Sequence, residues 1–255
     1  MHRLIHIGIL LSLITSASLA PLDSQTIDSL AFKDLQFRMV GPFRGGRSSA
    51  VTGFPTDLDR WLMGTTGGGV WETTDNGISW RNISDGFFGG SIGAVRVANS
   101  DPNVIYVGQG SADIRGNTST GRGMWKSMDA GRTWAFIGLP EAGQIGRIEV
   151  HPDNHDLVYV AALGHPFGKN PERGIFKSED GGETWNHVLA LNDSTGASDL
   201  TMDMVNPRIL YAGMWRGERK PWTLISGAEE GGVYKSADGG ETWRKLGGGL
   251  PEGII

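Results

Sequence analysis

Short apolar runs alternate with polar turns along most of the chain, and their order repeats. The run Val104–Val107 follows a turn rich in Asp, Asn and Pro, and similar runs follow similar turns near positions 57, 153 and 206. Because the apolar residues in these runs are consecutive, both faces of each strand must be covered. The pattern therefore predicts strands packed between neighbouring sheets, and it lacks the 3.6-residue period of amphipathic helices.

Each repeat contains four predicted strands. First-strand candidates span 49–54, 92–97, 145–150 and 200–204, and second-strand candidates include 61–63, 104–107, 157–160 and 209–211. The third and fourth strands flank a turn of the form Ser/Thr-x-Asp-x-Gly-x-Thr/Ser-Trp. We expect four repeats at about 48–82, 91–138, 144–190 and 198–247.

The turn motif has a structural explanation. Its glycine supplies the positive φ of a tight turn, and its carboxylate accepts hydrogen bonds from backbone N–H groups of the same turn. We expect the closing Trp to lie in the fourth strand and to wedge between adjacent sheets. Four equivalent sites do not converge on one substrate, so a catalytic or metal-binding role is not expected. The motif residues are Asp75, Trp80, Asp129, Trp134, Asp180, Trp185, Asp238 and Trp243.

These repeats predict an all-β fold, a β-propeller of four-stranded antiparallel blades, because sheets arranged around an axis bury both faces of each blade. The segment Phe37–Val40 resembles a fourth strand that lacks its first three, and it is a candidate ring-closing strand. The last repeat already has a fourth strand at 242–246, so we expect an incomplete ring with at least one more blade beyond Ile255. The alternative is a closed four-bladed ring with a spare N-terminal strand.

The N-terminus has the features of a signal peptide at 1–20, cleaved after Ala20, with a basic start, an apolar run and a small-residue cleavage signal. A polar lead-in follows at 21–34, before the propeller at 35–255. The apolar run is too short to span a bilayer, and no later segment is apolar enough to do so. The mature protein is therefore expected to be secreted or periplasmic.

Composition excludes several functions. The formal net charge of -5 provides no basic field for a phosphate backbone, so nucleic acid is not an expected partner. The absence of cysteine excludes disulfides and a thiol nucleophile. No cofactor is expected, and no metal site either, because a turn explains the cluster of His151, Asp153, His155 and Asp156.

The four motifs resemble the Asp boxes, or BNR repeats, of sialidases, xyloglucanase-type glycoside hydrolases and the sortilin propeller, over residues 35–250. The chain most resembles the secreted bacterial proteins described as sortilin-like or BNR-repeat glycosyl hydrolases. The resemblance implies the propeller fold, but the family includes hydrolases, sorting receptors and assembly factors, so it leaves the function open.

Ligand-binding residues are expected on the face that carries the loops between second and third strands and between repeats, opposite the motif turns. The candidates are Arg44, Arg47, Asp113, Arg115, His165, Arg216 and Trp222. A wider set of charges on the same face comprises Asp85, Glu141, Lys169, Asp193, Asp199, Arg219 and Lys220. Any one of them could instead be an ordinary solvated charge.

This mixture of arginines, carboxylates and an aromatic residue suits a protein, peptide or glycan ligand, and it favours a non-catalytic binding module. The alternative is a glycoside hydrolase acting on polysaccharide. Similarity to xyloglucanases would place a catalytic acid just before the Gly-Gly of the first repeat, where this chain has Thr66. The sialidase motif is matched only in part, by Phe37, Arg38 and Met39.

Overall fold

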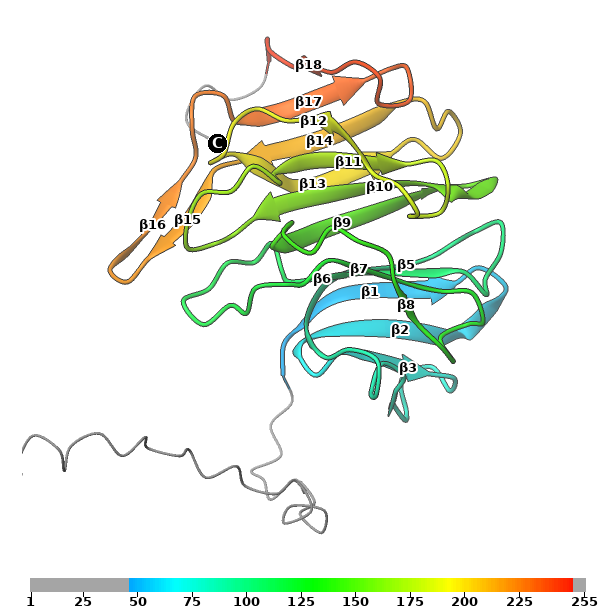
Figure 1. The fold of residues 1–255 in the computed structure, drawn as a ribbon. Helices are drawn as coiled ribbons and strands as arrows, with labels where there is room; N and C mark the ends of the chain where they lie inside the picture. Colours follow the sequence, from blue (N-terminus) through cyan, green and yellow to red (C-terminus); the bar gives the residue numbers. More distant parts are fainter. Residues whose placement is uncertain (1–45, 250–255) are drawn as a thin grey trace, which may run out of the picture. The chain divides into compact units, whose positions relative to one another are not determined.

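The computed structural model describes residues 46–249, which form strands and turns without a helix (Figure 1). The first blade pairs its strands in chain order: β1 (Ser48–Phe54), β2 (Asp57–Gly67), β3 (Val70–Thr73) and β4 (Arg81–Asn82). The second follows the same order with β5 (Gly90–Val97), β6 (Ile105–Gln109), β7 (Met124–Ser127) and β8 (Ala135–Phe136). A short pairing of β2 with β5 joins these two blades.

The third blade consists of β9 (Gln144–His151), β10 (Asn154–Gly164), β11 (Gly174–Ser178) and β12 (Asn186–Leu189). The fourth consists of β13 (Gly196–Met202), β14 (Leu210–Trp215), β17 (Gly232–Ser236) and β18 (Arg244–Lys245). Between β14 and β17 the chain forms an additional hairpin of β15 (Gly217–Lys220) and β16 (Thr223–Ser226). All pairings between these strands are antiparallel, as expected for propeller blades.

Successive residues of the second strands pack into different cores. In β6, Ile105 and Val107 lie in the core between the first two blades, whereas Tyr106 lies between the second and third. In β10, Val160 faces the second blade and Tyr159 faces the fourth. All five side chains are at most 1% exposed. The two-sided burial predicted from the consecutive apolar residues is therefore confirmed, and it positions each blade against the next.

The blades form an open arc. Their first strands lie on the inner side, where β1 contacts β5, β5 contacts β9 and β9 contacts β13. Within residues 46–249, β13 makes no comparable contact with β1. Figure 1 shows the resulting succession from the first blade in blue and cyan to the fourth in yellow to red. The described blades thus match an incomplete ring rather than a closed ring of four.

The motif turns are held by the hydrogen bonds that the sequence suggested. The Asp129 carboxylate accepts bonds from the Thr133 N–H at 2.8 Å and from its hydroxyl at 2.7 Å, and Gly131 has a φ of 87°. These bonds, led by that of the Thr133 hydroxyl, lower the pKa of Asp129 to about 2. Ala130, just before the glycine, also has a positive φ, and its N–H donates to the carbonyl of Asn103. This second bond fastens the motif turn to the other turn of the same blade, which the sequence did not reveal.

The motif tryptophans differ slightly from expectation. Each immediately precedes the fourth strand of its blade instead of lying within it. The indole N–H of Trp134 donates to the Ile83 carbonyl at 2.9 Å, and that of Trp185 donates to the Ile137 carbonyl at 2.7 Å, so both join one blade to the preceding one. Trp80 and Trp243 donate to a glycine carbonyl of their own turn. Just ahead of the fourth strand, where the chain leaves the turn, an indole can reach across to the neighbouring blade.

The largest differences from the prediction lie in the fourth blade. Its first strand was expected at 200–204 but spans Gly196–Met202, because the small residues at 196–198 permit a close approach to the third blade. A Cβ on Gly196 would lie 2.3 Å from the Leu163 carbonyl oxygen. The β15–β16 hairpin was not predicted. The expected signal peptide, the lead-in and the strand at Phe37–Val40 lie outside the described residues, and within these no helix has the length and apolar character to cross a membrane.

Candidate functional site

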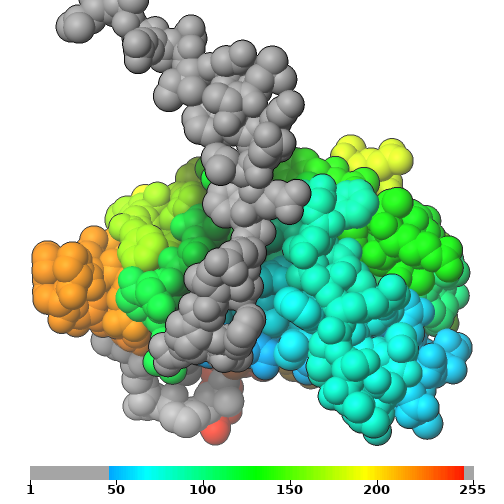
Figure 2. Space-filling model, turned by 90° about the horizontal axis from the view of Figure 1, so that it is seen from below, coloured from blue at the N-terminus to red at the C-terminus, as the bar shows by residue number. Residues whose placement is uncertain are grey.

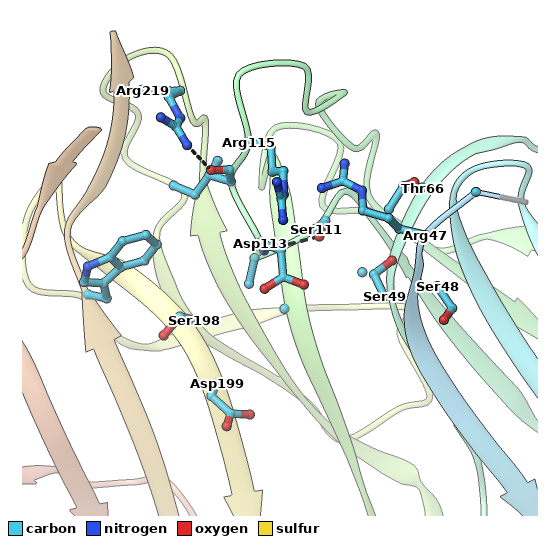
Figure 3. A pocket seen from close by; sticks show the side chains of 16 residues that line it. Arg47, Ser48, Ser49, Thr66, Ser111, Asp113, Arg115, Ser198, Asp199 and Arg219 are labelled. Carbon is cyan, nitrogen blue, oxygen red and sulfur yellow. Dashed lines mark hydrogen bonds between the residues drawn. The ribbon is translucent and has the colours of Figure 1, made fainter. Parts of the chain in front are cut away.

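A groove of about 1080 Å³ lies on the loop-bearing face, on the inner side of the arc (Figure 3). Arg47 precedes β1, Asp113 and Arg115 belong to the loop between β6 and β7, Asp199 lies in β13 and Arg219 in β15. The first, second and fourth blades therefore all contribute charged side chains. The groove is large enough for a ligand of several sugar rings or amino acids.

Two glycines allow the inner strands to converge at this groove. A Cβ on Gly93 of β5 would lie 1.9 Å from the Ile145 carbonyl oxygen, and one on Gly146 of β9 would lie 2.3 Å from that of Ser198. Either side chain would force the neighbouring strands apart. The close approach of β5, β9 and β13 sets the width of the groove wall.

The loop that carries Asp113 and Arg115 is anchored at several points. The Ser111 N–H donates to the Gln144 side chain, which in turn donates to the Ser119 carbonyl at 3.0 Å. The Arg115 N–H donates to the Thr118 hydroxyl at 2.9 Å. Because the loop is bonded to itself and to β9, its two charged side chains have a fixed backbone beneath them.

Charges of both signs face the groove. Figure 3 shows Arg47, Arg115 and Arg219 in the upper part of the view, with Asp113 and Asp199 below them. Asp113 has no ion-pair partner among residues 46–249, whereas the Asp199 carboxylate lies 3.9 Å from the Arg147 guanidinium. The groove thus combines two carboxylates with a cationic rim.

A chain of ion pairs continues deeper along the inner strands. Glu149 of β9 pairs with Arg96 of β5 at 3.0 Å and with Arg147 at 3.3 Å. Burial raises the pKa of Glu149, and the two guanidinium groups act in the opposite direction. The Glu149 carboxylate is therefore occupied by its two arginine partners, and its role is structural.

A second, smaller pocket of about 460 Å³ adjoins the first and shares Arg219 with it. It lies beside the tip of the β15–β16 hairpin, which projects in orange from one side of the body in Figure 2. Trp222 at the tip is 81% exposed, and Phe167 on the adjoining wall is 51% exposed. The two exposed aromatic rings beside this pocket form a surface on which a flat apolar ligand face can stack.

The candidates from the sequence divide into groups. Arg47, Asp113 and Arg115 meet in the groove, and Trp222 lies in the adjoining pocket. His165 lines neither pocket, and its ring lies 3.7 Å from the Glu141 carboxylate. Arg216 is likewise outside both pockets and is paired with Glu218 at 3.8 Å. Arg44 lies outside the described residues.

The groove also contains residues that the sequence ranked lower or missed. Asp199 and Arg219 belonged only to the wider set of face charges, and Ser198 and Trp215 were not singled out.

Another residue without a sequence signal is Arg173, which is 1% exposed and donates to the carbonyls of Leu163, Ser194, His165 and Gly168. It organises the loop after β10 from inside, so its charge is structural.

Comparison with families of known proteins gave no match to a family model. Among curated proteins, the chain is 23% identical over 226 residues to an oligoxyloglucan-reducing end-specific xyloglucanase of Emericella nidulans, which covers 84% of this chain and 25% of the relative. It is 24% identical over 196 residues to a xyloglucanase of Hypocrea jecorina, with 67% and 22% covered. The chain thus spans about a quarter of the length of these relatives.

Solved structures resemble the described blades at a similarly low sequence identity. An ancestral GH74 enzyme superimposes with a TM-score of 0.59 at 23% identity, covering 83% of this chain and 25% of the other. The GH74 xyloglucanase of Xanthomonas campestris gives a TM-score of 0.55 at 21% identity, covering 77% and 29%. These likenesses agree with the strand topology, and together they establish that the chain has a β-propeller fold.

Proposed function

We propose that this chain contributes to a propeller glycoside hydrolase that holds a polysaccharide in the loop-face groove. The observation that carries the proposal is the presence of two carboxylates, Asp113 and Asp199, on separate blades of one groove. The similarity to xyloglucanases supports it as well. The proposal adopts the alternative left open by the sequence, in preference to a non-catalytic binding module.

Glycoside hydrolysis requires two carboxyl groups on either side of the scissile bond. One protonates the departing glycosidic oxygen, and the other activates water or attacks the sugar carbon. Asp113 comes from a loop of the second blade and Asp199 from the first strand of the fourth, so a glycan lying between these blades contacts both. Neither residue belongs to the repeated motif turns, whose aspartates are committed to backbone N–H groups.

Thr66 also lines the groove, at the place where similarity to xyloglucanases would require an acid. Its backbone N–H donates to the Arg47 carbonyl at 3.0 Å. The proposal therefore assigns the acid chemistry to the second and fourth blades.

We further propose that the protein acts outside the cytoplasm, where the predicted signal peptide would direct it, and that its motif turns are true Asp boxes.

The test is release of new reducing ends from polysaccharides by the purified full-length protein, with xyloglucan first because of the named activity of the relatives. We expect turnover that falls by at least about a hundredfold in Asp113→Asn and in Asp199→Asn. Asp153→Asn provides the matched control, since Asp153 is an exposed carboxylate in the turn between β9 and β10. Turnover unaffected by both groove substitutions, or absent on every polysaccharide tested, would refute the proposal.

A further inference from the structure

Three arginines face the groove without an ionic partner in the described part of the chain. Arg47, Arg115 and Arg219 come from separate segments of the chain, and none has a carboxylate within 4.0 Å among residues 46–249. Like charges gathered at one surface repel each other unless a counter-charge lies between them. This arrangement therefore favours an anion in the groove.

Deeper in the arc, the arrangement is different. Arg96 and Arg147 both face Glu149, so the scaffold supplies the counter-charge for its own inner arginines. The groove contains two carboxylates, but Asp199 already lies near Arg147 and Asp113 is in contact with no cation of the described chain. Within the described residues, no ion pair therefore compensates the positive charge of the three rim arginines.

Two of the rim arginines are bonded to the same loop. The guanidinium of Arg219 donates to the Ile114 carbonyl at 3.0 Å, and the backbone N–H of Arg115 donates to Thr118. Ile114 is 6% exposed and anchors this loop in the protein. Arg219 keeps its remaining N–H groups available near the groove, except for the buried Nε, which has no partner in the described structure. A guanidinium fork held in this way, as in Arg219, matches the geometry of a carboxylate.

We propose that the groove selects an acidic glycan, whose uronic acid carboxylates pair with Arg47, Arg115 and Arg219. The choice of a glycan rests on the proposed function, whereas the choice of an acidic one rests on the uncompensated rim. A uronic acid residue offers its carboxylate to the guanidinium groups and its hydroxyls to the serines along the groove, among them Ser48 and Ser198. Xyloglucan is uncharged and would leave the three arginines unpaired.

The test measures binding of the full chain to oligosaccharides of polygalacturonate, alginate and glucuronoxylan, each beside its carboxyl-reduced counterpart. Reduction changes the carboxylate into a primary alcohol and keeps the backbone. We expect at least one acidic oligosaccharide to bind about tenfold or more tightly than its reduced form, and added salt to weaken that binding. Xyloglucan oligosaccharides and an oligoglutamate peptide complete the set.

Arginine variants test whether the preference for acidic oligosaccharides arises in the groove. Arg47→Gln combined with Arg115→Gln should weaken binding of the acidic oligosaccharide at least about tenfold, because each removes a charged hydrogen-bond donor. Arg244→Gln, on the outer strand β18, is the control and should change nothing. Arg115→Lys should give an intermediate loss, since lysine keeps the charge but loses the fork. Far-ultraviolet circular dichroism and thermal midpoints confirm that the variants fold.

The outcomes separate the two proposals. Equal binding of acidic and reduced glycans, insensitive to the arginine substitutions, would overturn the acidic selectivity and leave hydrolysis in the groove intact. Oligoglutamate binding as tightly as the best acidic glycan would overturn the choice of a glycan. A complete absence of glycan binding would contradict both the acidic selectivity and the proposed function.

Discussion

The hydroxyl of Tyr106 in β6 donates a hydrogen bond to the His155 carbonyl at 2.9 Å, and this bond ties the second blade to the start of β10 in the third. Tyr159 of β10 makes a similar link one blade further on, with a bond at 2.7 Å to the Gly239 carbonyl in the motif turn of the fourth blade. Burial raises the pKa of both phenols, because ionisation would place a charge in the core. The repeated hydroxyl bond is thus part of the joint between blades.

Removal of this bond should loosen the joint. Tyr106→Phe and Tyr159→Phe should each lower the free energy of unfolding by about 1 kcal/mol, since the ring stays in place and only a hydrogen bond is lost. Urea denaturation measures the change. Tyr211→Phe is the matched control, because Tyr211 is partly exposed and its hydroxyl has no hydrogen bond in the described part of the chain. An equal loss in all three variants would contradict the role of the bond.

Acid should weaken the motif turns. The lowered pKa of Asp129, about 2 in the folded state against an ordinary 3.8, means that its ionised form stabilises the fold. This contribution is complete above about pH 4 and is lost as the pH falls through 2. Asp129→Asn should therefore lower the thermal midpoint at pH 5 and flatten its decline between pH 4 and 2. Asp153→Asn should leave the decline as steep as in the unmodified chain, and a steeper decline for Asp129→Asn would be inconsistent with the turn geometry.

The buried carboxylate of Glu72 in β3 should contribute strongly to the first blade. Its side chain is fully buried and pairs with Arg60 at 2.6 Å and with Arg81 at 2.5 Å. Glu72→Ala should cost about 3 kcal/mol or more, because it removes both bonds and leaves Arg60 partly buried without its partner. Arg81→Ala should cost less than about 1 kcal/mol, since that side chain is 72% exposed. Chemical denaturation of both variants measures the two losses of stability. A larger loss for Arg81→Ala than for Glu72→Ala would contradict the role assigned to the buried carboxylate.

The hairpin tip should contribute to ligand affinity and not to stability. Trp222 is 81% exposed, so Trp222→Ala should leave the thermal midpoint unchanged. Loss of a stacking ring should weaken binding of a long oligosaccharide by about fivefold, corresponding to ~1 kcal/mol. A short oligosaccharide confined to the main groove should bind as before. Calorimetric titration with both lengths separates these cases, and equal weakening of the two would place the hairpin in the main groove.

The fold could be predicted because its physical signals are local and repeated. The consecutive apolar residues around Tyr106 required cover on both faces, and the Asp–Gly–Trp turns required a hairpin at each recurrence. The β15–β16 hairpin escaped prediction because its strands, Gly217–Lys220 and Thr223–Ser226, are short and largely polar, and pair only with each other. The early start of β13 escaped because small residues carry little strand preference, although their size is what allows close packing.

The site was predictable only in part. The sequence placed Arg47, Asp113 and Arg115 on one face, and the structure brings them to one groove. It could not tell that His165 would turn toward Glu141 or that Arg216 would pair with Glu218, because these contacts depend on the path of long loops. The presence of Asp113 and Asp199 in one groove also depends on the spacing between the second and fourth blades, which no local pattern encodes.

The most direct test of a glycan site in the groove is hydrogen–deuterium exchange of the chain with xyloglucan and with polygalacturonate, compared with the chain alone. If the groove holds a glycan, backbone amides in 111–119 and 196–202 should become protected, more strongly with polygalacturonate, while the motif turn at 127–133 stays unchanged. Protection confined to the motif turns, or no protection by either polysaccharide, would contradict a glycan site between the second and fourth blades.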